Sequence, residues 1–523
     1  MIGAALSVFA VLGIAAGTRK VSAFFAAGRR VEPVYNGVAI AASLFALLAV
    51  AGVANWSPEK SKGGLFIVLG GAGGLLLAAT LLAPYLRRFG GVTLPDFFGE
   101  RFGTVSRLFA VLVVIAVSFP ALVLALSALG HHAADVFEFD LQRGVGVAVA
   151  LLLCCTLFGG MRGQSAVLVV QYAVLLPVSL IALGITLLRG GSVTGSVLGG
   201  AGLADLASTL GLAAFAPADP INRAALIFCL VAGTAAFPHI LMRAFTTPSV
   251  DGARWSFFWA IPLTAALLAA APAYDMLSYQ PAAESVSIIF PGLLILGAIT
   301  GLLAAASGLL LATSNVLSYD VFYRSLDSTA TPAGRLLAAR AALLVVVALA
   351  ALAVLRGPIE IVAITPLAFS LAASALLPAL LLGIWWKRAN AAGAVAGMVV
   401  AVAICLGYFL VPRYFPITFF EISSKVFASA DDLARYDTLK QAYALAGGLA
   451  KEAARIAWEQ EFLTRTHWWG IKAVYAGVFA APAALLVTIL VSLVTPRPSR
   501  DIQAFVAELR RGNGPDSGST ARA

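Results

Sequence analysis

The chain has 523 residues, of which 61% are hydrophobic and 11% are charged. Soluble globular proteins carry about 25% charged residues, so this composition excludes a water-soluble enzyme and a disordered chain. Long apolar runs, in place of alternating segments of about ten residues, also exclude a transmembrane β-barrel. The sequence therefore predicts an all-α polytopic membrane protein, and its net charge of +10 reflects loop topology and not a nucleic-acid partner.

Apolar segments follow one another along the whole chain, and a helical span needs about 20 residues. We predict thirteen transmembrane helices, near residues 2–17, 34–55, 63–86, 107–130, 145–159, 165–188, 223–246, 255–274, 287–319, 337–355, 358–385, 391–412 and 470–494.

The distribution of basic residues predicts the orientation. No basic region precedes segment 2–17, and Thr18-Arg19-Lys20 follows it, which is typical of an uncleaved first span with its N-terminus outside. Lys and Arg then concentrate in alternate short loops, such as 87–107 and 243–254. We therefore expect a multi-pass protein of the plasma (inner) membrane, with its N-terminus outside and its C-terminus in the cytoplasm.

Two segments outside the spans are expected to be amphipathic. Residues 430–463 alternate charged residues with alanine and leucine, which predicts one or two helices on the outer surface. The expected role of these helices is a surface cap, and a lid or a partner-docking element is the alternative. In the tail, Ile502, Phe505, Val506 and Leu509 have helical spacing, which predicts a short helix on the inner membrane surface.

Ionisable groups are scarce within the spans. Glu360 lies near one end of its segment, and Asp275 and Asp320 are expected just beyond the ends of theirs. Intramembrane charges are usually functional, so their scarcity argues against a carboxylate proton relay. Neither a phosphate-binding loop nor a nucleophile–base pair is recognisable, so we expect no enzyme and no cofactor.

Segment 223–246 contains signals that break a helix. Pro238 lacks a main-chain donor, and Gly233 weakens the preceding turn. Transporters build binding sites near the membrane midplane from main-chain groups freed in this way. A packing kink, with His239 as a buried core residue, is the alternative.

Several motifs occur in an order that resembles the sodium:solute symporter family, and within it the cation/acetate symporter (monocarboxylate permease) branch. They are Phe25-Ala26-Ala27-Gly28-Arg29, Gly91-Val92-Thr93-Leu94-Pro95-Asp96-Phe97, Gly233-Thr234-Ala235, Pro238-His239-Ile240-Leu241-Met242-Arg243, Asp320-Val321-Phe322 and Gly383-Ile384-Trp385-Trp386-Lys387-Arg388.

The resemblance implies a five-plus-five inverted-repeat (LeuT-type) core with alternating access, in which segments 34–55 and 223–246 are the broken helices. The expected organisation is an extra span and loop in 1–33, a ten-span transport core in 34–388, a further span in 389–412, a periplasmic amphipathic segment in 413–469, the last span in 470–495 and a cytoplasmic tail in 496–523.

The resemblance also implies a sodium site between segments 34–55 and 287–319. Its carbonyl positions fall on Ala42 and Phe45, and its hydroxyl positions fall on Ala304 and Ala305, which have no hydroxyl. A hard cation requires oxygen ligands. Ser307 could supply one if the helix register slips by three residues. Sodium coupling, proton coupling and weak or absent coupling therefore stay open.

The expected function is import of a small, acetate-like monocarboxylate by cation-coupled symport. The candidate substrate contacts are Ser43, Gly233, Thr234, Pro238 and His239. A sodium symporter for an amino acid or a vitamin, and a transporter-like membrane sensor, are the alternatives. The expected partners are a small organic anion, Na+ or H+ as the coupling ion and the lipid bilayer, and a small membrane subunit could accompany them.

Overall fold

The computed structural model describes residues 2–53, 64–189, 220–269, 289–356, 367–463 and 466–511, and its described secondary structure is helical. Within these described ranges eight helices are long and apolar enough to cross a bilayer, or up to ten if each of two bent helix pairs is one span. Every one of the thirteen predicted segments overlaps a described helix, although thirteen spans stay a prediction. Predicted segment ends at 54–55, 63, 270–274, 287–288 and 358–366 lie outside the described residues.

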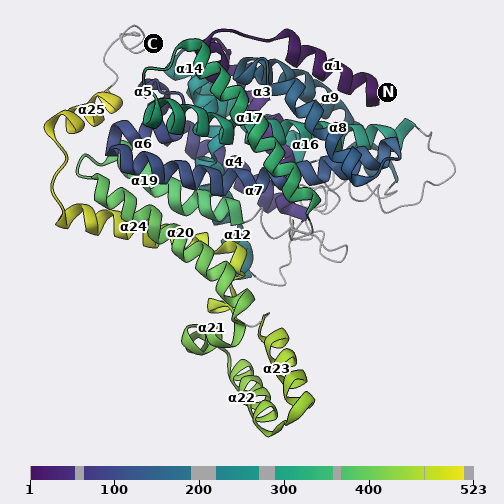
Figure 1. Ribbon diagram of the computed structural model, residues 1–523, viewed down its shortest axis with the longest axis vertical. Helices are drawn as coiled ribbons and strands as arrows, with labels where there is room; N and C mark the ends of the chain where they lie inside the picture. Colours follow the sequence, from purple (N-terminus) through teal and green to yellow (C-terminus); the bar gives the residue numbers. More distant parts are fainter. Residues whose placement is uncertain are drawn as a thin grey trace, which may run out of the picture.

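The helices are labelled as in Figure 1. The first half comprises α1 Ile2–Ala15, α2 Val21–Ala26, α3 Pro33–Val53, α4 Gly64–Leu77, α5 Ala83–Phe89, α6 Leu94–Phe102, α7 Thr104–Phe137, α8 Leu141–Thr156, α9 Gly160–Arg189, α12 Pro220–Ala236, α13 Pro238–Leu241 and α14 Val250–Ala269. The second half comprises α16 Ile289–Asn315, α17 Pro332–Leu355, α19 Leu377–Trp385, α20 Ala391–Tyr414, α21 Pro416–Ile422, α22 Ala430–Leu445, α23 Gly448–Leu463, α24 Gly477–Val494 and α25 Arg500–Arg511.

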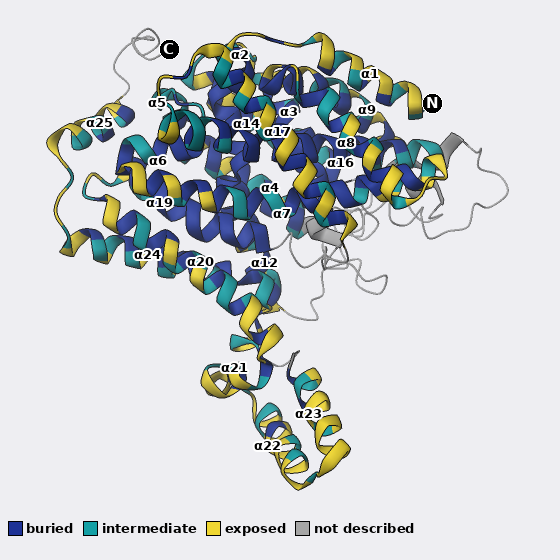
Figure 2. Cartoon of the chain, viewed as in Figure 1, coloured by how far each residue is buried: buried dark blue, intermediate teal, exposed yellow. Residues whose placement is uncertain are grey.

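The helices form one bundle around a buried centre (Figure 2). Within it α3 packs against α9, α14 and α16, while α12 packs against α4 and α16 packs against α7. Outside this group α20 and α24 pair closely (Figure 1). A Cβ at Gly397 would lie 2.0 Å from Oγ1 of Thr488, so the close approach of α20 to α24 depends on a residue without a side chain.

The predicted break in segment 223–246 is confirmed. Phe237 is extended, with φ −66° and ψ 123°, and separates α12 from α13. Pro238 opens α13, where its missing N–H costs no helical hydrogen bond. The two helical parts meet at 42°.

The predicted break in segment 34–55 is wrong for the described residues, because α3 is continuous from Pro33 to Val53. Beyond its first residue α3 lacks proline and is rich in alanine and leucine, which favour helix. The chain bends before α3 instead, where Val21–Arg29 and Pro33–Leu48 meet at 108°.

Helix α16 does not end where the sequence suggested. It continues as the π-helical segment η5, Val316–Leu326, so Asp320 lies buried within the helix and not beyond its end. The π-helical turns account for the error, because they extend the segment through polar residues that look like a loop. Glu360 and Asp275 lie outside the described residues.

Helices α21, α22 and α23 project from the bundle (Figure 1). They form a hairpin with its own small core, made by Phe420, Tyr436, Trp458 and Phe462. The predicted amphipathic helices over 430–463 are therefore present as two antiparallel helices, α22 and α23.

The predicted amphipathic helix of the tail is present as α25, and its place on the inner membrane surface stays a prediction. Val506 and Leu509 are buried on its inner face, and the ring of Phe505 lies 6.1 Å from that of Phe89. Helix α25 packs on α5 and α19. We call this end of the bundle, where α6 and α25 lie, the α6 end.

Candidate functional site

The break between α12 and α13 carries two buried polar side chains, His239 and Thr234. His239 is 4% exposed; the main chain of Ser43 lies beside its ring, but neither ring nitrogen forms a hydrogen bond of ordinary geometry with a described residue. The hydroxyl of Thr234 is fully buried and also lacks a described partner. Because buried polar groups are normally hydrogen-bonded, these atoms identify the break as a candidate ligand site.

Aromatic rings enclose the break. The Phe237 ring lies edge-on to His239 with centroids 5.2 Å apart, and its centroid is 5.0 Å from that of Phe369. These rings provide an apolar wall beside the His239 imidazole. Small-molecule sites commonly combine an apolar lining with a few polar groups.

Arg243 lies one turn beyond His239 and is 1% exposed. Its Nη2 donates to Oε1 of Gln164 at 2.6 Å, and its Nη1 donates to Oγ of Ser165 at 2.8 Å. No described carboxylate lies within ion-pair distance of this guanidinium. Burying a cation among neutral groups is costly, so the site favours an anion.

The main chain at Arg243 is tied to the start of α3. Asn36 donates from Nδ2 to the Arg243 carbonyl at 3.0 Å, and Thr246 donates from Oγ1 to Oδ1 of Asn36 at 3.1 Å. All three residues are buried. The segment after α13 is therefore held rigidly against α3, which positions the guanidinium.

Gln164 joins this arginine to α16. Its Nε2 donates to Oγ of Ser307 at 3.1 Å, and Ser307 donates to the Ala304 carbonyl at 2.9 Å. The next residue, Gly308, leaves room for the imidazole, since a Cβ there would lie 2.9 Å from Cδ2 of His239. Residues of α9, α13 and α16 thus converge at one point.

The other predicted substrate contacts have different surroundings. The Ser43 hydroxyl lies 2.9 Å from the carbonyl of Ala39, in its own helix, which is the usual habit of serine in apolar helices. A Cβ at Gly233 would lie 2.5 Å from the Phe369 carbonyl, so Gly233 permits close packing. Pro238 begins α13.

The predicted cation positions lie on two helices that do pack together. Ala42 and Phe45 are buried on α3, and Ala304 and Ala305 are buried on α16. The carbonyls of Ala42 and Phe45 belong to a continuous helix. The hydroxyl of Ser307 donates to the Ala304 carbonyl at 2.9 Å within α16, and a hard cation would need such oxygens as ligands.

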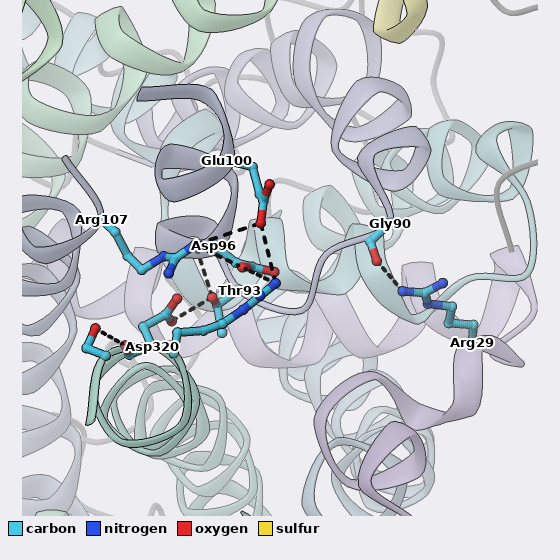
Figure 3. A network of polar contacts seen from close by, with 9 residues as sticks. Arg29, Gly90, Thr93, Asp96, Glu100, Arg107 and Asp320 are labelled. Carbon is cyan, nitrogen blue, oxygen red and sulfur yellow. Dashed lines mark hydrogen bonds and ion pairs between the residues drawn. The ribbon is translucent and has the colours of Figure 1, made fainter. Parts of the chain in front are cut away.

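A second polar cluster lies at the α6 end (Figure 3). Asp96 of α6 forms ion pairs with Arg324 at 3.1 Å and Arg107 at 3.7 Å. Burial raises the pKa of Asp96, although Arg324 and Arg107 oppose the shift. Thr93 donates from Oγ1 to Oδ2 of Asp320 at 2.6 Å, so the cluster joins α6 and α7 to η5.

Sequence reasoning did not select Arg243, Gln164 or Asp96 as site residues. Arg243 and Asp96 both lie within motifs that carried the resemblance. The signal for Arg243 was an arginine directly after an interrupted apolar segment. Gln164 gave no signal, because its role depends on three helices meeting.

Comparisons with known proteins indicate the family of the chain. The model of the sodium:solute symporter family matches residues 24–276 and 274–401. An uncharacterized symporter of Cupriavidus necator is 26% identical over 97% of this chain and 92% of its own length. A monocarboxylic acid transporter of Corynebacterium glutamicum is 25% identical, over 74% of this chain and 78% of its own.

Among solved structures, a Na+-coupled sialic acid symporter in a substrate-bound, outward-open state has a similar fold. The TM-score is 0.67 at 16% sequence identity, over 95% of this chain and 98% of that chain. The family model covers well over half of the sequence, and the fold resembles that of this solved symporter. The chain therefore belongs to the sodium:solute symporter family.

Proposed function

We propose that the protein imports a small, acetate-like monocarboxylate by cation-coupled symport with alternating access. The observation that carries this proposal is the buried Arg243 guanidinium, which has neutral hydrogen-bond partners and no described carboxylate. A carboxylate that reached this region would supply the missing negative charge.

The buried polar groups at the break support a small solute. His239 and Thr234 offer polar atoms, while Phe237 and Phe369 offer an apolar surface for a short alkyl group. Ser43, Gly233 and Pro238 shape the surroundings. The similarity to a monocarboxylic acid transporter favours the same substrate class over an amino acid or a vitamin.

For the coupling ion we propose Na+, held between α3 and α16. Ala42, Phe45, Ala304 and Ala305 would contribute main-chain oxygens and Ser307 a hydroxyl. Family membership supports this choice. Helix α3 would have to open locally near Ala42, because its carbonyls are otherwise used within the helix.

We further propose that the α6 end faces the cytoplasm, with residues 34–388 as the transport core. The Lys and Arg residues of the short loops concentrate on this side. The hairpin of α22 and α23 would then be periplasmic, and the N-terminus would lie outside.

The test is uptake of radiolabelled acetate into proteoliposomes, with Na+ and proton gradients imposed separately. We expect accumulation driven by the inward Na+ gradient and competition by pyruvate and propionate. Uptake that ignores both gradients would contradict symport. Competition by amino acids or vitamins, but not by monocarboxylates, would show that the substrate belongs to one of those classes instead. Solute binding without any uptake would favour a transporter-like membrane sensor.

A further inference from the structure

We propose that a pocket at the α6 end binds an anionic phosphate or carboxylate group, at a site separate from the helix break. The pocket has a volume of about 560 Å³. It lies between the end of α6, the start of α20 and the linker from α24 to α25. The lining residues are 99–103, 390–392, 495–498 and Ile502.

The start of α20 supplies main-chain donors. Asn390 caps this 24-residue helix, and its side chain accepts from the Gly393 N–H at 2.9 Å. The N–H groups of Ala391 and Ala392, which line the pocket, have no hydrogen-bond partner among the described residues. Free donors at the positive end of a long helix favour an anion.

Arg101 is a second and independent feature of the pocket. It lines the pocket and is 2% exposed. Its Nε and Nη2 donate to the carbonyls of Gly383 and Ala389 at 3.0 and 2.9 Å, while its Nη1 is buried without a described partner. Burial lowers the pKa of Arg101 to about 10, and no described carboxylate neutralises it. An anion in the pocket would lie near this charge, and the guanidinium also packs over the Phe102 ring at 4.7 Å from its centroid.

The remaining lining separates into charged and apolar parts. Arg497 is exposed at the rim, and Glu100, which also lines the pocket, is directed to Arg324 at 3.6 Å. Phe102, Pro496 and Ile502 are apolar. The pocket lies where the membrane-spanning helix α20 begins and α24 ends, which is the depth at which lipid headgroups are expected. An acidic lipid headgroup therefore fits the pocket, and a soluble phosphate or carboxylate carries the same anionic group.

Two substitutions weaken the proposed anion site without disturbing the helices. Ala391→Pro deletes one N–H at the first helical position, where proline is well tolerated, and Asn390 already has the extended φ of −127° and ψ of 175° that a following proline requires. Ala391→Ser keeps the N–H and is its control. Arg497→Gln removes the rim charge, and Arg500→Gln, outside the pocket, is its control.

The full-length protein is reconstituted in nanodiscs of phosphatidylcholine alone or with phosphatidylglycerol. Thermal unfolding is followed, and bound lipids are counted by native mass spectrometry. In detergent, inorganic phosphate is titrated in the same assay. We expect phosphatidylglycerol to raise the Tm of the wild type and of both controls, and to raise it less in Ala391→Pro and Arg497→Gln.

A rise in Tm with phosphatidylglycerol and not with inorganic phosphate identifies the bound anion as a lipid headgroup. A matching rise with inorganic phosphate identifies it as a soluble anion. Equal shifts in the wild type, Ala391→Pro and Arg497→Gln would overturn the proposal, as would a wild type that responds to neither anion. Both readouts report binding and not uptake, so failure here is distinguishable from failure of the proposed transport function.

Discussion

Gln164 accepts a hydrogen bond of 2.6 Å from Arg243 and so fixes a buried cation of the broken helix to α9. The same amide donates to Ser307 of α16. One neutral side chain therefore connects the proposed substrate region to the proposed cation region. Alternating access requires such connections, because a ligand shifts a conformational equilibrium only through contacts that differ between the two states.

Replacement of Arg243 tests the anion site. Arg243→Gln is expected to lower acetate uptake at least about tenfold, because loss of a buried charged partner costs roughly 2–5 kcal/mol and 1.4 kcal/mol is tenfold in binding. Initial uptake rates and the Tm are measured together, since the variant also loses hydrogen bonds to Gln164 and Ser165. Arg254→Gln, at an exposed arginine, is the control. Wild-type uptake by Arg243→Gln would exclude this residue from solute recognition.

Replacement of Thr234 by valine distinguishes a role in solute binding from a role in packing. Thr234→Val replaces a buried hydroxyl without a described partner by a methyl group of similar size. A packing residue would then gain stability or stay unchanged. We expect an unchanged or higher Tm together with a rise in KM of roughly 2- to 10-fold, the value of one hydrogen bond to the solute. A higher Tm with an unchanged KM would show that Thr234 has only a packing role and does not contact the solute.

The contact between Gly308 and His239 predicts a local steric effect. Gly308→Ala places a Cβ 2.9 Å from Cδ2 of His239 and is expected to displace the imidazole and lower uptake severalfold. Gly407→Ala is the matched control, because a Cβ there meets nothing within 4 Å and alanine favours helix. Equal uptake by both variants would show that the position of the imidazole does not matter for transport.

Ser307 tests the proposed cation site. Ser307→Ala removes the hydroxyl between Gln164 and the Ala304 carbonyl. We expect the Na+ concentration for half-maximal uptake to rise severalfold. Ser318→Ala is the control, since the Ser318 hydroxyl bonds the carbonyl of Ser314 in its own helix. An unchanged Na+ dependence in Ser307→Ala would move the cation site elsewhere.

Asp96 makes stability depend on pH. Because burial raises its pKa above the ordinary value of 3.8, the folded protein binds this proton more tightly than the unfolded chain does. The free energy of unfolding therefore falls as pH rises from the ordinary pKa through the raised one. Asp96→Asn is expected to flatten the dependence of Tm on pH in this interval, whereas Asp501→Asn, on the exposed face of α25, keeps it. An unchanged slope in Asp96→Asn would assign the titration to another group.

The sequence predicted the helices well because each apolar segment carries its own signal. It also predicted the break at Pro238, since proline acts locally. The break expected in segment 34–55 came from the resemblance, whereas the composition of α3 itself favours a continuous helix. The π-helical extension through Asp320 was missed because it depends on packing against neighbouring helices. Gln164 was missed for the same reason: its importance comes from contacts with Arg243 and Ser307, which lie far from it in the sequence.

The hairpin has a practical consequence for chemical labelling. The four cysteines lie in α8, α12 and α20, and Cys155, Cys229 and Cys405 are buried. Leu445, at the tip of the hairpin, is 88% exposed. A thiol introduced by Leu445→Cys would therefore react with a membrane-impermeant maleimide far faster than the native thiols. Intact cells treated in this way would report directly which side of the membrane the hairpin occupies.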